Sequence, residues 1–203
     1  MTTFFLIRHG ANDFVGKSLV GRRAGVHLNE AGKAEAERLA DGLAASQINL
    51  VFSSPMERCR ETAEPIARRL GLQVQVLEEL NEIQFGDWTG LELEGLTGSD
   101  LWRQWNTFRT GVRIPNGETI HEIQARMVRA IDMLRRKFAE QRIALVSHGD
   151  PLRSVLCFYL GMPLDFIPRL EVSPASISAL EIDDWSVKVT ALNAPPGSPL
   201  AAC

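Results

Sequence analysis

Short apolar runs alternate with longer helix-forming segments along this sequence, and this alternation is the feature that most constrains the fold. Phe4 to Ile7, Leu50 to Ser53 and Ile143 to Ser147 each have the length and composition of a buried strand. Strands that alternate with helices form a mainly parallel sheet with helices on both faces. In such sheets, ligands bind outside the carboxyl ends of the strands.

The other elements follow from the same patterns. Further strands are predicted around 74–76, at 177–182 and at 187–192, the last two joined by an Asp183-Asp184 turn. Helices are predicted over about 30–46, from Ser54 to near Gly71, from Thr119 to Phe138, and up to Gly161.

Three capping patterns mark helix starts. Asn29 is the predicted cap of the first helix, whose inner face we expect to consist of Ala31, Ala34, Leu39 and Leu43. Ser54-Pro55-Met56-Glu57 combines a serine cap, a proline at the first helical position and a glutamate at the third. On that reading Arg58 is the fourth residue of its helix. Thr119-Ile120-His121-Glu122 is a second capping box.

The chain length suits a single domain. At 203 residues it can bury one sizeable core. We assign residues 1–193 to one catalytic domain, with 91–117 as an excursion over the active-site edge because that stretch has four glycines and no clear period. The proline- and glycine-rich tail over 194–203 is predicted to be disordered.

Composition argues against several partners. A formal net charge of -3 provides no field that gathers polyanions, so we expect neither a nucleic-acid nor a membrane surface. No apolar stretch approaches the ~20 residues that span a bilayer, and the start lacks the pattern of a signal peptide. Cys59, Cys157 and Cys203 form neither a disulfide framework nor a zinc motif, which favours a reducing cytoplasm.

Residues suited to phosphate chemistry stand at the ends of three predicted strands. They are Arg8-His9-Gly10, Ser53-Ser54-Pro55-Met56-Glu57-Arg58 and Ser147-His148-Gly149. If these strands are neighbours, two imidazoles and two guanidiniums converge on one crevice. An arginine fork matches phosphate oxygens, and a helix N-terminus adds N–H donors to the same anion.

Such chemistry also needs a nucleophile and a proton donor. A neutral imidazole attacks phosphorus, and neighbouring arginines favour the neutral form because like charges disfavour imidazolium. His9 is therefore the candidate nucleophile. Glu82 is the candidate donor, although Glu78 and Glu79 stand close to it in the sequence.

Four ordered motifs resemble those of the phosphoglycerate-mutase-like histidine phosphatases. They are Ile7-Arg8-His9-Gly10, Ser53 to Arg58 with Glu61-Thr62-Ala63, Glu82 with Phe85 to Gly90, and Val146 to Gly149. The resemblance covers about residues 4–160 and implies an α/β fold: a three-layer α/β/α sandwich with a mainly parallel sheet. It also implies that His9 is phosphorylated, that Arg8, Arg58 and His148 bind the phosphoryl group, and that Glu82 acts as general acid and then base. No metal or other cofactor is implied.

The sequence departs from that pattern after its first motif. Many relatives carry Glu-Thr or Glu-Ser after Arg-His-Gly and an Asn several residues later, whereas this chain has Ala11-Asn12 and Val15. The stretches 19–23 and 25–29 resemble a subgroup described only as phosphomutases, which names no substrate. We therefore expect a small phosphorylated metabolite and leave its identity and the oligomeric state open. The predicted substrate contacts are Arg8, Asn12, Gly21, Arg58, His148 and Gly149.

Three other functions are weighed against a phosphatase. A phosphoglycerate-mutase-type phosphomutase needs a closing segment rich in cations, and residues 91–117 offer only the isolated Arg103, Arg109 and Arg113. Residues 11–18 match a permissive phosphate-binding loop, but the stricter form needs Gly at position 11, and the following residues do not read as a helix. A non-catalytic binding module would not need the full set of candidate catalytic residues.

Several conspicuous residues have ordinary structural interpretations. We expect His27 to be a loop residue and His121 a bystander in its capping box. Trp88, Trp102 and Trp105 are predicted to pack together rather than stack on bases.

Overall fold

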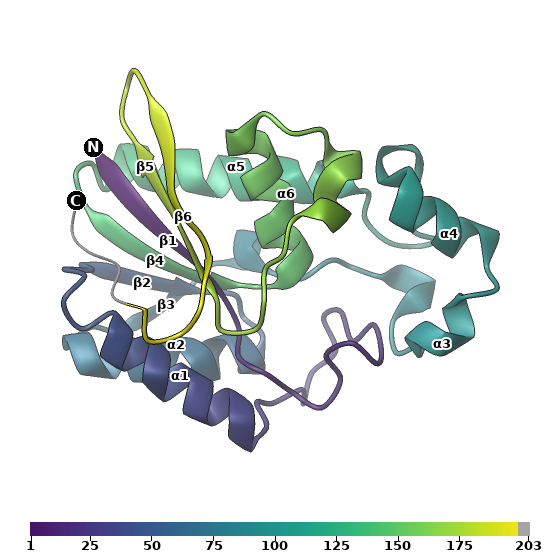
Figure 1. The fold of residues 1–203 in the computed structure, drawn as a ribbon, viewed down its shortest axis with the longest axis horizontal. Coiled ribbons are helices and arrows are strands. Elements are labelled where there is room, and N and C mark those ends of the chain that lie inside the picture. The colour runs from purple at the N-terminus through teal and green to yellow at the C-terminus, as the bar shows by residue number, and fades with distance from the viewer. Residues whose placement is uncertain (199–203) are drawn as a thin grey trace.

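A six-stranded sheet forms the centre of the computed structural model, which describes residues 1–198 (Figure 1). The strand order is β3-β2-β4-β1-β5-β6. The strands are β1 (Thr2–Arg8), β2 (Leu50–Ser53), β3 (Val74–Val76), β4 (Arg142–Ser147), β5 (Ile177–Ile182) and β6 (Val187–Ala194). β3, β2, β4 and β1 pair in parallel, whereas β5 and β6 join antiparallel at one edge. The sheet is therefore mainly parallel, as predicted.

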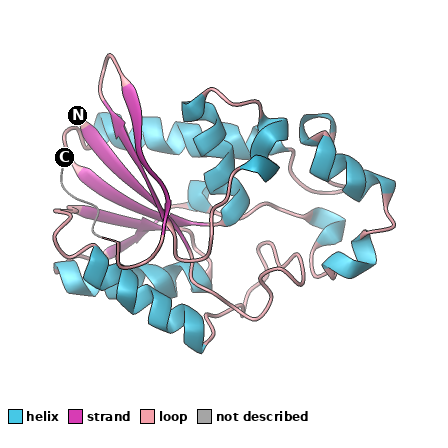
Figure 2. Cartoon of the chain, in the orientation of Figure 1, coloured by secondary structure: helices cyan, strands magenta, loops and turns pink. Residues whose placement is uncertain are grey.

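Helices cover both faces of the sheet (Figure 2). The α-helices are α1 (Glu30–Gly42), α2 (Glu57–Leu70), α3 (Leu93–Leu96), α4 (Asp100–Thr107), α5 (Ile120–Lys137) and α6 (Gly149–Leu160). Short 3-10 helices occupy Glu78–Leu80, Gly86–Trp88, Arg109–Gly111 and Leu164–Arg169. Figure 1 shows α1 and α2 on one side of the sheet and α5 and α6 on the other. The predicted α/β/α sandwich is confirmed.

Alternation along β1 divides the core into two layers. Phe4 and Leu6 belong to the cluster that also contains the apolar face of α5, whereas Phe5 and Ile7 pack with residues of α1 and α2. Successive side chains of a strand point to opposite faces, so one fully buried strand supplies both layers.

The inner face of α1 differs from the prediction. Asn29 caps the helix as expected, its side chain accepting from the Gly32 backbone N–H, but the helix ends at Gly42 rather than at 46. Leu39 and Leu43 are buried, while Ala31 and Ala34 are exposed; the rest of the inner face is Gly32, Ala36 and Ala40. Position 32 faces inward, and the Ala11 carbonyl approaches it so closely that an added Cβ would lie 2.0 Å from the carbonyl oxygen. Only glycine fits there.

The start of α2 also differs. Met56, not Ser54, is the cap residue, and it makes no side-chain capping bond. The Ser54 hydroxyl pairs with His148 Nε2, at the end of the neighbouring strand β4, at 2.8 Å, and accepts from the Met56 backbone N–H only at 3.4 Å. Arg58 is consequently the second residue of α2. The helix ends at Leu70, close to the predicted end, and Gly71 caps it in the left-handed conformation.

The other predicted boundaries agree closely with the structure. The Thr119 capping box is present, and α6 ends at Leu160 with Gly161 as its C-cap. β6 runs to Ala194, so the predicted tail begins inside a strand; residues 199–203 lie outside the described part of the chain. Within residues 1–198, no helix has both the length and the apolar character needed to cross a membrane.

Residues 91–117 are more regular than expected, since they contain α3, α4 and the 3-10 helix Arg109–Gly111. Trp88 packs edge-on against Trp102 and Trp105, with ring centroids 5.5 and 6.0 Å away. This confirms the packing interpretation of the tryptophans. The loop over 11–18 leads into turns and an isolated bridge between Ser18 and Glu92. A phosphate-binding loop must lead into a helix, and this loop does not.

Candidate active site

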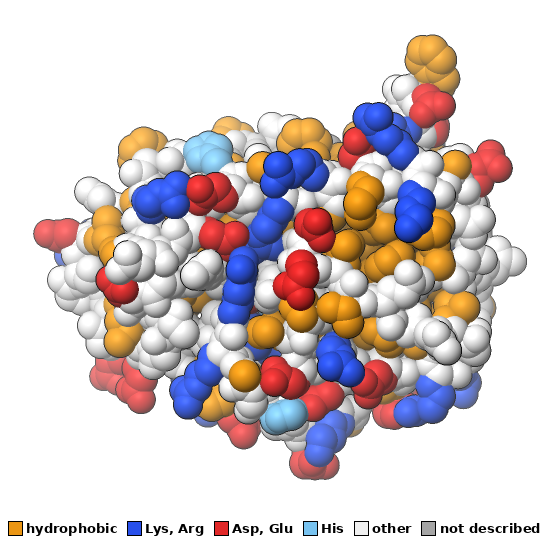
Figure 3. Space-filling model, turned by 180° about the vertical axis from the view of Figure 1, so that it is seen from behind, with side chains coloured by type: hydrophobic (Ala, Val, Ile, Leu, Met, Phe, Trp, Pro, Cys, Tyr) orange, Lys and Arg blue, Asp and Glu red, His pale blue; other side chains and the backbone are white. Residues whose placement is uncertain are grey.

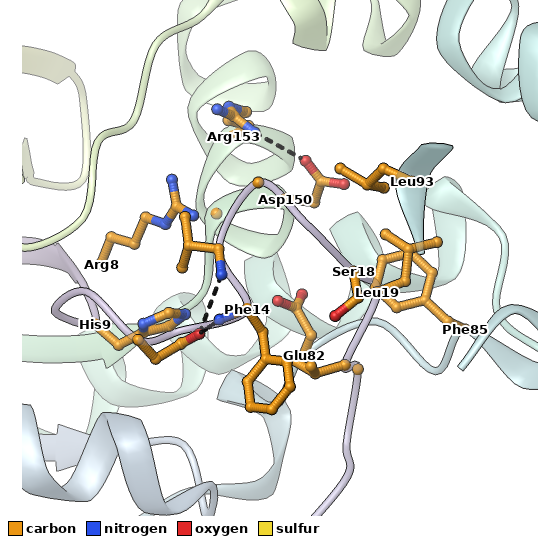
Figure 4. Close-up of a pocket in the computed structure, with 16 residues that line it drawn as sticks. Arg8, His9, Phe14, Ser18, Leu19, Glu82, Phe85, Leu93, Asp150 and Arg153 are labelled. Carbon is orange, nitrogen blue, oxygen red and sulfur yellow. Dashed lines mark hydrogen bonds and ion pairs between the residues drawn. The ribbon is translucent and has the colours of Figure 1, made fainter. Parts of the chain in front are cut away.

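The three polar strand ends lie side by side. β4 sits between β1 and β2, Arg8 is in register with Ser147, and Ser53 is in register with Val146. A cavity opens beside these ends (Figure 4). Its lining includes the predicted site residues Arg8, His9, Asn12, Gly21, Glu82 and Gly149. Arg58 and His148 are completely buried next to it.

A single hydrogen bond fixes the tautomer of His9. Its Nδ1 lies 2.8 Å from the Gly10 carbonyl oxygen, which can only accept. Nδ1 therefore carries the proton, and Nε2 keeps its lone pair. Burial, followed by the charges of Arg58 and Arg8, holds the pKa of His9 well below its usual range. The ring is thus neutral at pH 7.

Arg8 reaches the cavity with part of its guanidinium unpartnered. Its NH1 donates to the Val172 carbonyl at 2.6 Å, whereas its buried Nε has no acceptor within the described chain. A Cβ on Gly149 would lie 3.3 Å from the guanidinium carbon of Arg8. Gly149 therefore lets this arginine lie close to the N-terminus of α6.

Two hydrogen bonds hold the guanidinium of Arg58. Its NH2 donates to the Gly21 carbonyl at 2.8 Å and to His148 Nδ1 at 3.0 Å. Gly21 has a φ of +51°, in the left-handed region that favours glycine. Nε and NH1 of Arg58 are buried without an acceptor among residues 1–198.

His148 is the second buried imidazole of the site. Because its Nδ1 accepts from Arg58, its Nε2 carries the proton and donates to Ser54 Oγ. Burial and then Arg58 lower the pKa of His148 well below its usual value. Its ring meets that of His9 edge-on, with centroids 5.2 Å apart.

Glu82 supplies a carboxyl group with a shifted pKa. Burial raises the pKa of Glu82, opposed first by the charge of Arg58 and reinforced by that of Asp150. One oxygen accepts from the Ile83 backbone N–H at 2.9 Å, and the other lies 3.6 Å from His148 Nδ1. A raised pKa means that this carboxyl keeps its proton to a higher pH than an ordinary glutamate does.

Asn12 lines the cavity, but its side chain also shapes the loop. Its Oδ1 accepts from the backbone N–H groups of Phe14 and Val15, at 2.9 and 3.2 Å. This turn places Phe14 at the cavity wall, where Leu19, Phe85 and Leu93 add apolar surface.

Sequence reasoning missed an acidic and basic pair on α6. Asp150 and Arg153 line the cavity, and an Asp150 oxygen accepts from Arg153 NH1 at 3.1 Å (Figure 4). Buried Arg109, from the excursion, lies 3.2 Å from the other oxygen. Burial alone would raise the pKa of Asp150, but Arg109 and Arg153 together lower it. The i, i+3 spacing of Asp150 and Arg153 just after His148-Gly149 was the available signal.

The remaining histidines lie outside the site. His27 is exposed and pairs with Glu61, and His121 is exposed on α5. Among residues 1–198, no three His, Cys, Asp or Glu side chains form a group that could hold a metal ion.

A mainly parallel sheet whose strand ends gather two neutral imidazoles, two arginines and a carboxyl group has the groups of a phosphoryl-transfer enzyme. The comparison with known families agrees. Residues 4–195 match the model of the histidine phosphatase superfamily (branch 1), and the chain belongs to that family.

Relatives with assigned activities include phosphatases and a mutase. Phosphoserine phosphatase 1 of Hydrogenobacter thermophilus is 27% identical over 95% of this chain and 92% of its own. A probable phosphoglycerate mutase of Photorhabdus laumondii is 29% identical over 89% of this chain and 85% of its own. A mycobacterial glucosyl-3-phosphoglycerate phosphatase, solved in complex with VO3, is 27% identical, with a TM-score of 0.85 over 95% of this chain and 98% of that one.

Proposed function

We propose that this enzyme hydrolyses small phosphate monoesters through a phosphohistidine formed on His9. One observation carries the proposal: a neutral imidazole with a free Nε2 stands beside buried guanidinium donors that lack acceptors. Histidine with this tautomer is a nucleophile, and the donors match an anion.

The phosphoryl group would occupy the space between the arginines. Nε of Arg8 and both Nε and NH1 of Arg58 are buried without acceptors in the described chain. A buried donor left unpaired costs about 1–3 kcal/mol, and more when it is charged. Phosphate oxygens would satisfy these donors with charge-assisted hydrogen bonds, and the protonated Nε2 of His148 could add another if it turns from Ser54.

The reaction divides into two balanced steps. Nε2 of His9 attacks phosphorus, the P–O ester bond breaks, and Glu82 gives its proton to the departing alkoxide. Water then attacks the phosphohistidine, Glu82 takes a proton from it, and inorganic phosphate leaves with His9 neutral again. The low pKa of His9 supports the first step and the raised pKa of Glu82 supports both.

The substrate class is a small phosphorylated metabolite. The two phosphatases named above are named for phosphoserine and glucosyl-3-phosphoglycerate, and the mutase for phosphoglycerate; all three are small phosphate monoesters. We further propose that Asn12, Gly21 and Gly149 line the substrate, that no metal takes part, and that the enzyme works in the cytoplasm without binding nucleic acid or membranes.

Trapping the intermediate tests the proposal. After rapid alkaline quench with a labelled phosphate ester, the wild type should carry a base-stable, acid-labile phosphate, and His9→Ala should carry none. Turnover of His9→Ala should fall on the order of 10³-fold or more. His27→Ala, which removes an exposed imidazole, should keep both label and turnover. Label on His9→Ala would overturn the assignment.

A further inference from the structure

The segment that carries Glu82 has no regular secondary structure over residues 81–85. Two guanidiniums hold its backbone instead. The Glu82 carbonyl accepts from Arg22 Nε at 2.8 Å and from Arg126 NH2 at 3.1 Å. Arg126 NH1 also donates to the Glu79 carbonyl at 2.5 Å. These bonds replace the ladder of hydrogen bonds that a helix or strand would supply.

Glu118 joins the two arginines to each other and to the same segment. Its Oε2 accepts from Arg22 NH2 at 3.0 Å and from the Gln84 backbone N–H at 2.8 Å. Its Oε1 accepts from Arg126 Nε at 3.2 Å. The Gln84 carbonyl in turn accepts from the Glu118 backbone N–H at 3.0 Å. Both carboxylate oxygens are therefore committed.

The network is shielded from water. The side chains of Arg126 and Glu118 are 11% and 17% exposed, and that of Arg22 is 33% exposed. Charge-assisted hydrogen bonds are stronger where water is excluded, and losing one member leaves the others with unpaired charges. Two parts of the chain distant from this segment thus fix it: the loop after β1, and the start of α5 with the residue before its cap.

We propose that Arg22, Glu118 and Arg126 are positioning residues for proton transfer, which hold Glu82 where its carboxyl reaches the ester oxygen. The proposal rests on the proposed function, in which Glu82 is the proton donor. Within residues 1–198, none of the three lines the cavity beside His9, so they act on the reaction through Glu82 and not on the substrate. Displacements near 1 Å can cost ~10²-fold in rate, which is the scale on which such a clamp matters.

The dependence of the rate on the leaving group distinguishes a role in positioning Glu82 from a role in loop packing alone. An alkyl phosphate needs a proton on its departing oxygen, whereas nitrophenyl phosphate releases a stable phenolate with little help. We would measure kcat and KM on both esters for Glu118→Gln, for Arg22→Gln and for each in a Glu82→Gln background. Arg22→Gln is the second variant because Arg22 is more exposed than Arg126, so its replacement should destabilise the fold less.

Glu122→Gln is the matched control. It makes the same change near the start of α5, but its carboxylate binds Arg113 and Thr119 rather than the Glu82 segment. It should keep the wild-type ratio of the two rates. Circular dichroism and thermal melting would confirm that every compared variant is folded.

We expect kcat on the alkyl ester to fall on the order of 10-fold in Glu118→Gln and Arg22→Gln, with a loss below about 3-fold on nitrophenyl phosphate and little change in KM. Neither change should add a loss to Glu82→Gln, because groups that act as one unit are non-additive. Equal losses on both esters, or a further loss in the Glu82→Gln background, would overturn the positioning role. Equal losses on the two esters for Glu82→Gln itself would instead overturn the assignment of Glu82 as proton donor. Failure of the positioning role and failure of the proposed function therefore give different results.

Discussion

At His9, the hydrogen bond to its neighbour's carbonyl decides which ring nitrogen can react. A backbone oxygen cannot donate, so Nδ1 must be protonated and Nε2 keeps its lone pair. The arginines that bind the phosphoryl group also keep this imidazole neutral. One pair of side chains thereby serves both binding and nucleophile activation.

Glu82→Gln tests the proton donor directly. The amide keeps the shape of the side chain but cannot transfer a proton, so esters with poor leaving groups should lose ~10²–10⁴-fold in kcat. Nitrophenyl phosphate should lose far less. Comparing kcat for the two esters at saturating substrate checks this, and similar losses for both would mean that Glu82 only supports the fold.

The pH profile should reflect His9 and Glu82 with opposite signs. The lowered pKa of His9 means that protonation stops the nucleophile only below the usual imidazole range, so the acid limb lies at low pH. The raised pKa of Glu82 means that the donor is lost above the usual carboxyl range as pH rises. A profile of kcat/KM on an alkyl phosphate should therefore be bell-shaped.

The basic limb of that profile has a specific control. The basic limb should disappear in Glu82→Gln, which has no proton to lose at this position. It should be weaker on nitrophenyl phosphate, whose leaving group depends little on the Glu82 proton. A basic limb unchanged in Glu82→Gln would assign it to another titratable group near Glu82; those around it include Arg58, Asp150, Arg8, Arg126 and the imidazole of His148.

The candidate residues and their surroundings were unequally predictable. His9 and His148 directly follow β1 and β4, Arg58 begins the helix after β2, and a parallel sheet brings such strand ends together whatever the loops do. Arg109, by contrast, meets Asp150 only through the tertiary path of the excursion. No local sequence pattern specifies this tertiary contact, so the sequence alone could not predict it.

At the scale of elements, the close approach of α1 to the loop after β1 depends on one glycine. Gly32→Ala would place a Cβ 2.0 Å from the Ala11 carbonyl oxygen, so helix or loop must move. Such overpacking costs about 1–3 kcal/mol. Urea unfolding should show that loss, and turnover should fall as well because Ala11 follows His9-Gly10.

Gly95→Ala provides the control for that substitution. Gly95 lies in α3, and an added Cβ would have no neighbour within 4 Å. Alanine is the better helix former, so stability should be unchanged or slightly higher. If the two variants unfolded at the same urea concentration, the close approach would not limit stability.

Helix starts show where local patterns stop being sufficient. Thr119 caps α5 as its sequence predicts, because both partners of the capping box lie within four residues. Ser54 has an equally good local pattern, yet its hydroxyl binds His148, which is 94 residues away. A buried imidazole N–H needs an acceptor, and that need outweighs a cap at a partly solvated helix end.

Across the whole molecule, the placement of the excursion's arginines bears on what accepts the phosphoryl group. Arg103 pairs with Asp100 and Arg113 with Glu122, both at the surface, while buried Arg109 faces Asp150. Figure 3 shows a face on which basic and acidic side chains are interspersed. A mutase must hold a doubly phosphorylated intermediate away from water, which needs cations free to clamp it.

We therefore expect water, not a second substrate hydroxyl, to take the phosphoryl group from His9. With 3-phosphoglycerate and catalytic 2,3-bisphosphoglycerate, phosphate release should outpace isomerisation. Both rates can be followed in one reaction, by phosphate detection and by separation of the 2- and 3-phosphoglycerate isomers. His9→Ala should abolish both, since each outcome passes through the same phosphohistidine. Isomerisation much faster than release would show that the site protects its phosphoenzyme from water, and the enzyme would then be a phosphomutase.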